Sequence, residues 1–182
     1  MISVIDNFFH PWQLKLVTSQ LKLLPFYNCF DHPENTASTY PGTKTEELIR
    51  VNPLLESFIT RKLENTGVPQ VIPSFQLSQY GHLRLESDNE DDFVHTDVGY
   101  DWAFLLYISD TNLESGTKMY GAARSLPVFF NNTPKDGDDI FIKFKQNRMV
   151  VFDSSVPHMA WGNHGKDLND GRLTINGFCE YT

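Results

Sequence analysis

The stretch Phe93-Val94-His95-Thr96-Asp97 places an imidazole and a carboxylate two residues apart. On a β-strand, residues i and i+2 point to the same face of the sheet. An imidazole and a carboxylate on one face are two ligands of a metal site. Because a His-x-Asp pattern often occurs by chance in a chain of this length, its meaning depends on the motifs farther along the chain.

Two further motifs occur downstream in an order that favours a metal site. Val156-Pro157-His158 offers a second imidazole after an apolar strand, and Arg172-Leu173-Thr174 places a guanidinium and a hydroxyl on one strand face. Two histidines and one carboxylate on one side of an ion leave coordination positions open, which suits non-haem Fe(II) and oxygen chemistry. His164, in a loop rich in glycine and asparagine, is the competing third ligand.

The composition sets the class of protein. A chain of 182 residues predicts one domain. The net charge of -8 argues against a nucleic-acid partner, whose phosphates the chain would repel. No apolar run reaches the length of a membrane span, and the first residues lack a signal-peptide pattern. With only two cysteines the chain has no disulfide framework, so we expect a cytoplasmic protein.

The first part of the chain, residues 1–70, predicts a short strand and two helices that support the rest. Pro11 and Pro53 stand where helices begin, the second after the capping residue Asn52. Apolar side chains near the helical period come after each proline; they are Trp12, Leu16, Val17 and Leu21, then Leu54, Leu55, Phe58, Ile59 and Leu63. Residues 31–47 predict a long loop, either a lid or binding loop or a disordered segment.

From residue 71 to the C-terminus the period of the pattern changes to two. Short apolar segments alternate with turn residues, which predicts a β-sandwich or barrel core over residues 71–182. Residues 102–108 predict a buried strand, 112–116 a turn, and 86–92 an acidic loop. The whole chain is thus expected to be a single domain, mostly helical at its start and β in its core.

These motifs, taken in order, resemble the Fe(II)/2-oxoglutarate-dependent dioxygenases, and among them the branch of the prolyl 4-hydroxylases. The resemblance covers most of residues 71–181; its pieces are His95 to Asp97, Leu105 to Ser109, Glu114 to Tyr120, Arg148 to Asp153, Val156 to His158 and Arg172 to Thr174. It implies a mainly β (α+β) fold, the double-stranded β-helix, a distorted cupin-like jelly roll with N-terminal helices packed on one sheet. The implied cofactors are Fe(II) and the co-substrate 2-oxoglutarate.

The same resemblance assigns roles to individual residues. His95, Asp97 and His158 would hold the iron, and Arg172 would pair with the distal carboxylate of 2-oxoglutarate. Tyr107 and Thr174 match positions that reach the same carboxylate; considered singly, each also fits the core of a sheet. Two departures are the long interval between His158 and Arg172 and Ser115-Gly116 in place of the family's frequent double glycine.

The implied reaction is hydroxylation of a substrate with release of succinate and carbon dioxide. The partners would be dioxygen and a peptidyl proline, an amino acid or a small metabolite, with no membrane and no nucleic acid; the sequence leaves the oligomeric state open. Tyr100, Trp102 and Trp161 are the expected aromatic walls of the substrate site. Two alternatives remain, a cupin-like isomerase or hydrolase with another divalent metal and a non-catalytic jelly-roll binding module.

Overall fold

The computed structural model describes residues 2–34, 40–66, 75–88, 94–121 and 139–181. Its helices are α1 (Pro11–Leu21), α2 (Leu48–Val51) and α3 (Pro53–Glu64). Its strands are β1 (Ile2–Ile5), β2 (Thr43–Lys44), β3 (Phe75–Arg84), β4 (Trp102–Tyr107), β5 (Asn112–Met119), β6 (Ile140–Phe144), β7 (Met149–Asp153), β8 (His158–Trp161) and β9 (Arg172–Tyr181). The prediction of a mainly β chain is confirmed.

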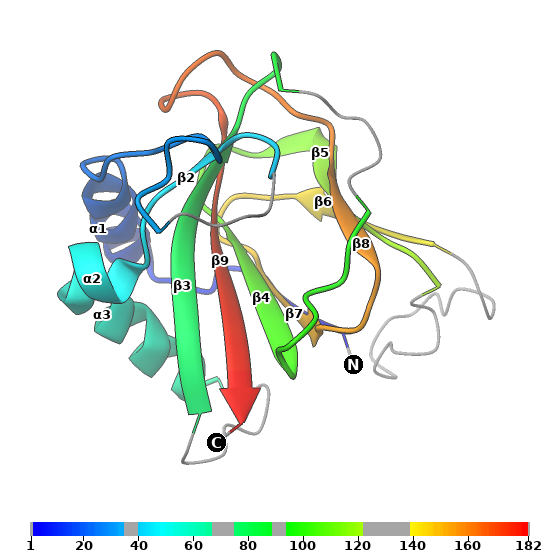
Figure 1. The fold of residues 1–182 in the computed structure, drawn as a ribbon, viewed down its shortest axis with the longest axis horizontal. Coiled ribbons are helices and arrows are strands. Elements are labelled where there is room, and N and C mark those ends of the chain that lie inside the picture. Colours follow the sequence, from blue (N-terminus) through cyan, green and yellow to red (C-terminus); the bar gives the residue numbers. More distant parts are fainter. Residues whose placement is uncertain (1, 35–39, 67–74, 89–93, 122–138, 182) are drawn as a thin grey trace.

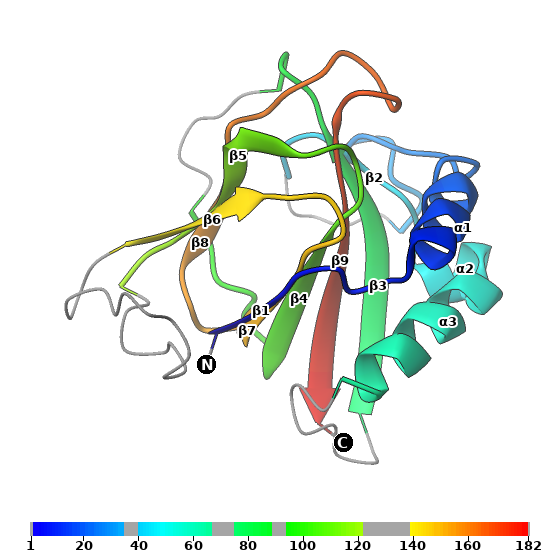
Figure 2. The ribbon, with the colours of Figure 1, turned by 180° about the vertical axis from the view of Figure 1, so that it is seen from behind.

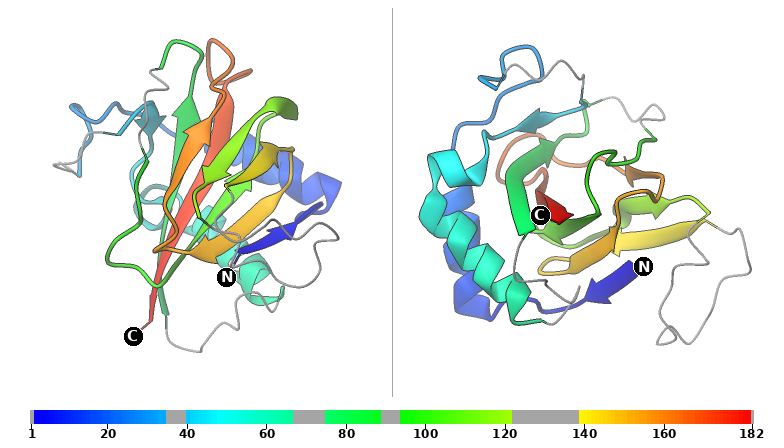
Figure 3. Two further views of the ribbon diagram at one scale, coloured as in Figure 1. Left: turned by 90° about the vertical axis from the view of Figure 1, so that its right-hand side faces the viewer. Right: turned by 60° about the horizontal axis from the view of Figure 1, so that its bottom comes forward.

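The strands form two antiparallel sheets that face each other. The larger sheet has the order β1-β7-β4-β9-β3-β2, and the smaller has the order β6-β5-β8. The helices lie on the outer side of the larger sheet, away from the smaller one (Figures 1 and 2). A view from below shows the same layers, with helices, large sheet and small sheet in succession (Figure 3).

The larger sheet is buried on both faces, and this explains the continuous apolar run of β4. Side chains from the helices pack on one face with Phe104 and Leu106, and the other face carries Leu105 and Tyr107 against the smaller sheet. All six residues of β4 are buried. Alternate residues therefore serve two separate cores, so the run shows no hydrophobic alternation.

Local sequence signals determine where the two longer helices begin. Pro11 and Pro53 each occupy the first turn, as predicted. The Asn52 side chain accepts a hydrogen bond from the Leu55 N–H at 3.1 Å, which caps α3. The buried residues of α3 are Leu55, Ile59 and Leu63, spaced four apart, so they define the face that contacts the sheet.

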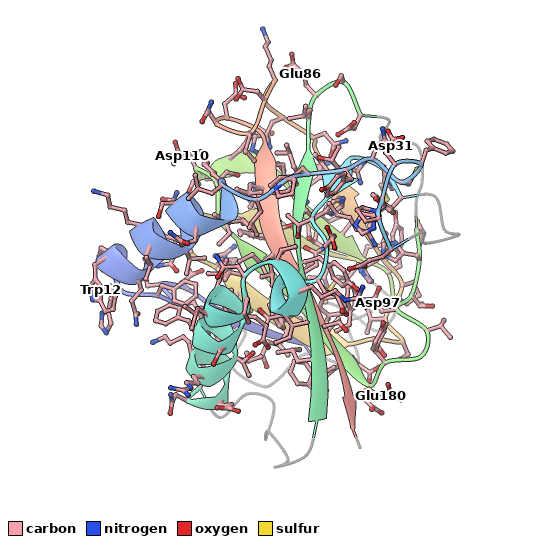
Figure 4. All side chains as sticks on the ribbon, turned by 60° about the vertical axis from the view of Figure 1, so that its left-hand side comes forward. Trp12, Asp31, Glu86, Asp97, Asp110 and Glu180 are labelled. Atoms are coloured by element: carbon pink, nitrogen blue, oxygen red, sulfur yellow. The ribbon has the colours of Figure 1, made fainter. Side chains whose placement is uncertain are left out.

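Three predicted apolar contacts of the helices are wrong. Leu54 is 83% exposed, Trp12 is 63% exposed and Leu16 is 43% exposed. Leu54 directly precedes Leu55 and is therefore rotated by about 100° from the buried face. Trp12 lies in the first turn of α1 and projects away from the sheet on the helix side (Figure 4).

The predicted turn at residues 112–116 is also wrong, because β5 runs through it. The pairing of β5 with β6 shifts register between Asn112 and Gly116. A Cβ at Gly116 would overlap the carbonyl of Ile142, so glycine lets the two backbones approach closely here. The sequence pattern resembled a turn because the irregular pairing breaks the alternation of a regular strand.

Some predictions fall partly outside the described residues. These are the loop at 31–47, of which residues 35–39 are not described, and the acidic loop at 86–92, of which residues 89–92 are not. Within the described part of 31–47 the chain forms β2 instead of a continuous loop. No helix among the described residues has the length and apolar character needed to cross a membrane.

The close contact between β9 and β4 gives a test of the fold. A Cβ at Gly177 would overlap the ring of Phe104, which is fully buried. We expect Gly177→Ala to lower the free energy of unfolding by about 1–3 kcal/mol through overpacking, as measured by urea denaturation. Combining it with Phe104→Leu should cost less than the sum of the two single changes. Additive costs would contradict this packing.

Candidate metal centre

His95 and His158 are held side by side by a reciprocal pair of backbone hydrogen bonds. The His95 N–H donates to the His158 carbonyl at 3.0 Å, and the His158 N–H donates to the His95 carbonyl at 2.8 Å. The two ring centroids are 4.4 Å apart. His95 makes only this isolated bridge, so the expected strand at 93–97 is not formed among its described residues.

Asp97 is positioned by the turn that precedes His158. Its N–H donates to the Ser154 carbonyl at 2.9 Å, and the Ser154 hydroxyl donates to the carbonyl of Tyr100. These contacts fix the 97–100 segment to the end of β7. As a result Asp97 and His158, 61 positions apart in the sequence, face one another.

The three side chains converge on one point. The Asp97 carboxylate oxygens lie 3.7 Å from His95 Nε2 and 3.7 Å from His158 Nε2. One ligand atom from each of the three residues lies within 4.8 Å of the other two. These separations are too long for good hydrogen bonds, whereas they suit three ligands of one ion.

The electrostatics of the site favour a bound cation. The Asp97 oxygen Oδ2 is buried and has no hydrogen-bond partner. Burial raises the pKa of Asp97 to about 6, although His95 opposes this shift. A carboxylate in such a place is costly when ionised alone, and a metal ion removes that cost. The donor set therefore fits a divalent metal.

His158 is held in the form that a metal requires. Its Nδ1 lies 3.0 Å from the carbonyl of Val156, which can only accept, so Nδ1 carries the hydrogen. Nε2 then presents its lone pair toward Asp97. Burial lowers the pKa of His158 to about 4, with a further contribution from His95, so the ring is neutral at pH 7. The hydrogen bond from Nδ1 to the Val156 carbonyl is the contact that a metal-ligating histidine usually makes with its other ring nitrogen.

Arg172 lies in the same cavity as the three side chains. The cavity has a volume of about 560 Å³, and His95, Asp97, His158 and Arg172 all line it. The Arg172 side chain donates to the Gly116 carbonyl at 3.0 Å, while its Nε is buried without a hydrogen-bond partner. Burial lowers the pKa of Arg172 to about 10, which leaves it charged at pH 7.

A second arginine lies beside Arg172. Arg84 of β3 is its register partner on β9, and the two side chains are 4% and 3% exposed. Both line the cavity. Adjacent buried guanidinium groups make this end of the cavity strongly positive, and such groups pair with carboxylates in a bidentate manner.

Tyr107 and Thr174 lie behind the cavity wall. The Tyr107 hydroxyl is 2.8 Å from the Thr117 hydroxyl, and its ring stacks on Phe144 at 4.4 Å. Thr174 donates to Asn176 Oδ1 at 2.8 Å. Neither is among the described residues that line the cavity. Direct contact of either with a ligand stays a prediction.

The three predicted aromatic walls are placed differently. Tyr100 lines the cavity, whereas Trp102 belongs to the core between the larger sheet and the helices. Trp161 packs edge-on against Phe141 at 5.4 Å and is not among the described lining residues. On β8 the residues His158 and Ala160 line the cavity, so Trp161, one position on, points away. His164, the competing ligand, lies against Phe144 instead of joining the cluster.

The sequence analysis did not identify much of the cavity wall that faces the candidate metal site. The missed residues come mainly from β3 and β9, with two from β2 and the segment before it, and they are Tyr40, Lys44, Tyr80, His82, Arg84, Asn176 and Phe178. The alternation of Tyr80, His82 and Arg84 along β3 was the available signal, since residues two apart share a face. Lys44 gave no such signal because it lies in a stretch that the sequence presents as a loop.

Comparison with known proteins establishes the fold. No family model matches the sequence, and a search of curated proteins finds no match. Among solved structures the chain is similar to the non-heme alpha ketoglutarate dependent epimerase SnoN from nogalamycin biosynthesis, with TM-score 0.64 and 9% identity over 99% of this chain and 78% of that one. At such identity the similarity concerns the fold.

Two other solved structures share this fold. HygX from Streptomyces hygroscopicus, solved with nickel, 2-oxoglutarate and hygromycin B, gives TM-score 0.64 and 15% identity over 98% of this chain and 82% of that one. A prolyl-4-hydroxylase from Pseudomonas putida gives TM-score 0.58 and 13% identity over 100% of this chain and 92% of that one. The chain thus has the fold of enzymes that include an epimerase and a hydroxylase.

The convergence of ligands predicts how Asp97→Asn behaves. We expect the wild-type chain to bind one Co(II) ion under calorimetry and the variant to bind it at least about 100-fold more weakly, a loss of about 2.7 kcal/mol. Asp110→Asn, which changes an exposed carboxylate outside the cavity, is the control.

Without metal, the same variant should be at least as stable as wild type at pH 7, because it removes an unpartnered buried charge. Metal should then raise the melting temperature of the wild type and not that of Asp97→Asn. Equal Co(II) affinity in the two proteins would exclude Asp97 as a ligand.

Proposed function

We propose that this protein is an Fe(II)- and 2-oxoglutarate-dependent dioxygenase that hydroxylates its substrate. One observation carries the proposal, namely that a cluster of two histidines and an aspartate opens into the same cavity as a buried arginine. We also propose that the two facing sheets form a double-stranded β-helix within a single domain of residues 1–182, in which residues 1–70 support the β core.

The metal ligands would be His95, Asp97 and His158. A set of two imidazoles and one carboxylate on one side of an ion is the facial arrangement typical of non-haem Fe(II) oxygenases. When bound, the iron supplies the activation of dioxygen that side chains alone do not provide. The protein contributes the fixed geometry of the ligands, since backbone hydrogen bonds at His95 and Asp97 hold them in place.

Arg172 would bind the distal carboxylate of 2-oxoglutarate. Its guanidinium is oriented by the Gly116 carbonyl at 3.0 Å and stands 5.8 Å from the Tyr107 ring centroid. Its Nε is buried without a hydrogen-bond partner among the described residues, so this donor would be free to bind a ligand. Tyr107 and Thr117, which bond each other behind it, would keep this donor in position.

The structural neighbours support this proposal without deciding the reaction. SnoN has been solved with Fe3+, alpha ketoglutarate and nogalamycin RO, and HygX with nickel, 2-oxoglutarate and hygromycin B. Those two proteins were solved with small molecules, whereas a prolyl-4-hydroxylase has the same fold. We propose hydroxylation, with one oxygen atom of dioxygen entering the product and the other entering succinate. The substrate would be a small metabolite, an amino acid or a peptidyl proline.

The buried arginine favours this proposal over the two alternatives. A cupin-like isomerase or hydrolase uses its metal without a 2-oxo acid, and a binding module needs no metal at all. Neither accounts for a guanidinium that is 3% exposed in the cavity shared with the ligand cluster. Burying such a charge without a partner is unfavourable unless a bound anion compensates for it.

An anaerobic titration tests the proposed function. A weak visible charge-transfer band should appear only when Fe(II) and 2-oxoglutarate are both present. Its absence at saturating concentrations of both would refute the assignment. When dioxygen is admitted, the wild-type protein with Fe(II) and 2-oxoglutarate should form succinate, and the Asp97→Ala variant should form none. Labelled dioxygen would then separate hydroxylation, which adds labelled oxygen to the product, from epimerisation, which adds none.

Removal of the guanidinium should weaken binding of the co-substrate specifically. We expect Arg172→Met to raise the dissociation constant for 2-oxoglutarate about 100-fold, since a bidentate charged pair is worth about 3 kcal/mol. Metal affinity should stay within about threefold, because Arg172 is not a ligand. Arg61→Met, on the exposed side of α3, is the control. Unchanged 2-oxoglutarate affinity in Arg172→Met would show that the co-substrate binds elsewhere.

A further inference from the structure

Lys44 stands in the cavity wall among aromatic rings. It is half-buried in the edge strand β2, opposite His82 of β3, and it lines the cavity. Its Nζ lies 4.6 Å from the ring centroid of Tyr40 and 4.8 Å from that of Tyr80. Such contacts hold an ammonium group while leaving its hydrogens available to an anion.

The carboxylates nearest to Lys44 are engaged by other groups. Glu47 accepts a hydrogen bond from the Tyr80 hydroxyl at 3.1 Å and pairs with Arg50 at 3.4 Å. Glu34 accepts from the Glu47 N–H at 2.8 Å. Among the described residues, no carboxylate forms an ion pair with Lys44. Burial lowers the pKa of Lys44, although the charges of Glu34 and Glu47 oppose this shift, and a bound anion would oppose it further.

Lys118 shows what a lysine with a structural partner looks like in this protein. Its Nζ lies 4.4 Å from the Tyr120 ring centroid and 5.2 Å from that of Phe141. It also pairs with Asp139 at 3.1 Å and is not among the described lining residues of the cavity. Both lysines therefore contact two rings, but only Lys118 has a carboxylate partner. Because Lys44 forms no ion pair with a carboxylate in the described part of the chain, its ammonium group can pair with an anionic ligand instead.

The cavity also offers flat apolar surfaces beside the metal site. Tyr100 is 38% exposed, its ring centroid is 5.2 Å from that of Phe178, and both residues line the cavity. The Tyr100 N–H donates to the Asp97 carbonyl at 3.3 Å, so this ring pair is attached directly to the ligand segment. Aromatic side chains favour flat apolar partners by stacking or edge contacts. A substrate ring here would lie next to the ion.

We infer that the substrate of this site is a small aromatic carboxylic acid, whose carboxylate pairs with Lys44 and whose ring packs on Tyr100 and Phe178. This inference rests on the proposed function, since it identifies the compound to be hydroxylated. In this arrangement Arg84 and Arg172 would bind the anionic co-substrate, and Lys44 would bind the anionic substrate. The co-substrate binds at Arg172, which is 3% exposed, and the substrate binds at the half-buried edge strand.

Matched acid and amide probes test the inference by binding alone. The full chain is loaded with Ni(II) and saturating 2-oxoglutarate and titrated calorimetrically with three pairs, benzoate and benzamide, phenylacetate and phenylacetamide, and cinnamate and cinnamamide. We expect the acid of at least one pair to bind about tenfold or more tightly than its amide. If no acid binds better than its amide, the inference is overturned.

Lys44 variants show whether this preference arises at the proposed place. Lys44→Met should remove the preference for the acid, Lys44→Arg should retain it, and Lys118→Met should behave like wild type. Circular dichroism checks the fold of each variant, and Lys44→Gln replaces Lys44→Met if the latter does not fold. A preference that survives the loss of the Lys44 charge would overturn the inference.

Titration of the same variants with 2-oxoglutarate separates this inference from the proposed function. Lys44→Met should bind 2-oxoglutarate as wild type does; an equal loss for 2-oxoglutarate and the aromatic acid would assign Lys44 to the co-substrate and overturn the inference. If the wild type shows no 2-oxoglutarate binding, the proposed function fails. The acid preference is then measured in the chain without co-substrate, where its dependence on Lys44 still decides the inference.

Discussion

The reciprocal hydrogen bonds between the backbones of His95 and His158 are the contact on which the candidate metal centre depends. They join a segment without regular strand structure to the first residue of β8, and they set the two rings 4.4 Å apart. Asp97 is held by a separate bond to Ser154 at 2.9 Å. Because these bonds use backbone atoms, the side chains stay available for a ligand. The fold thus brings the three candidate ligands together without using their side chains to hold the chain segments in place.

The layers of the structure explain why a cavity lies on one face of the larger sheet. Helices cover the opposite face, where Val17, Leu55 and Ile59 join the core. On the inner face the apolar packing is concentrated around β4 and β7, with Leu105 and Val150 in contact with the smaller sheet. Farther along the sheet, β3 and β9 carry polar and aromatic residues on that face. This part of the interface between the sheets is the cavity wall.

The sequence predicted elements whose causes are local. Pro53 after Asn52 identified the start of α3, and the apolar run at β4 identified a buried strand. The sequence could not reveal the register shift in β5, because the approach of Gly116 to Ile142 depends on a strand about 26 residues later. Lys44 shows the same limit, since its place in the wall comes from pairing β2 with β3.

Three positive groups in one cavity constrain what the site can recognise. Arg172 and Arg84 are nearly fully buried on adjacent strands, and Lys44 lies on the edge strand beyond β3. A single small dianion cannot use every one of these groups in the same way, because a planar guanidinium pairs in bidentate fashion and an ammonium acts as a point charge. The whole chain has a net charge of -8, yet Arg84, Arg172 and Lys44 all line this one cavity. Their local positive charge favours anionic ligands there. The Tyr100 and Phe178 rings in the same cavity would then favour an outer anion that carries a flat apolar body.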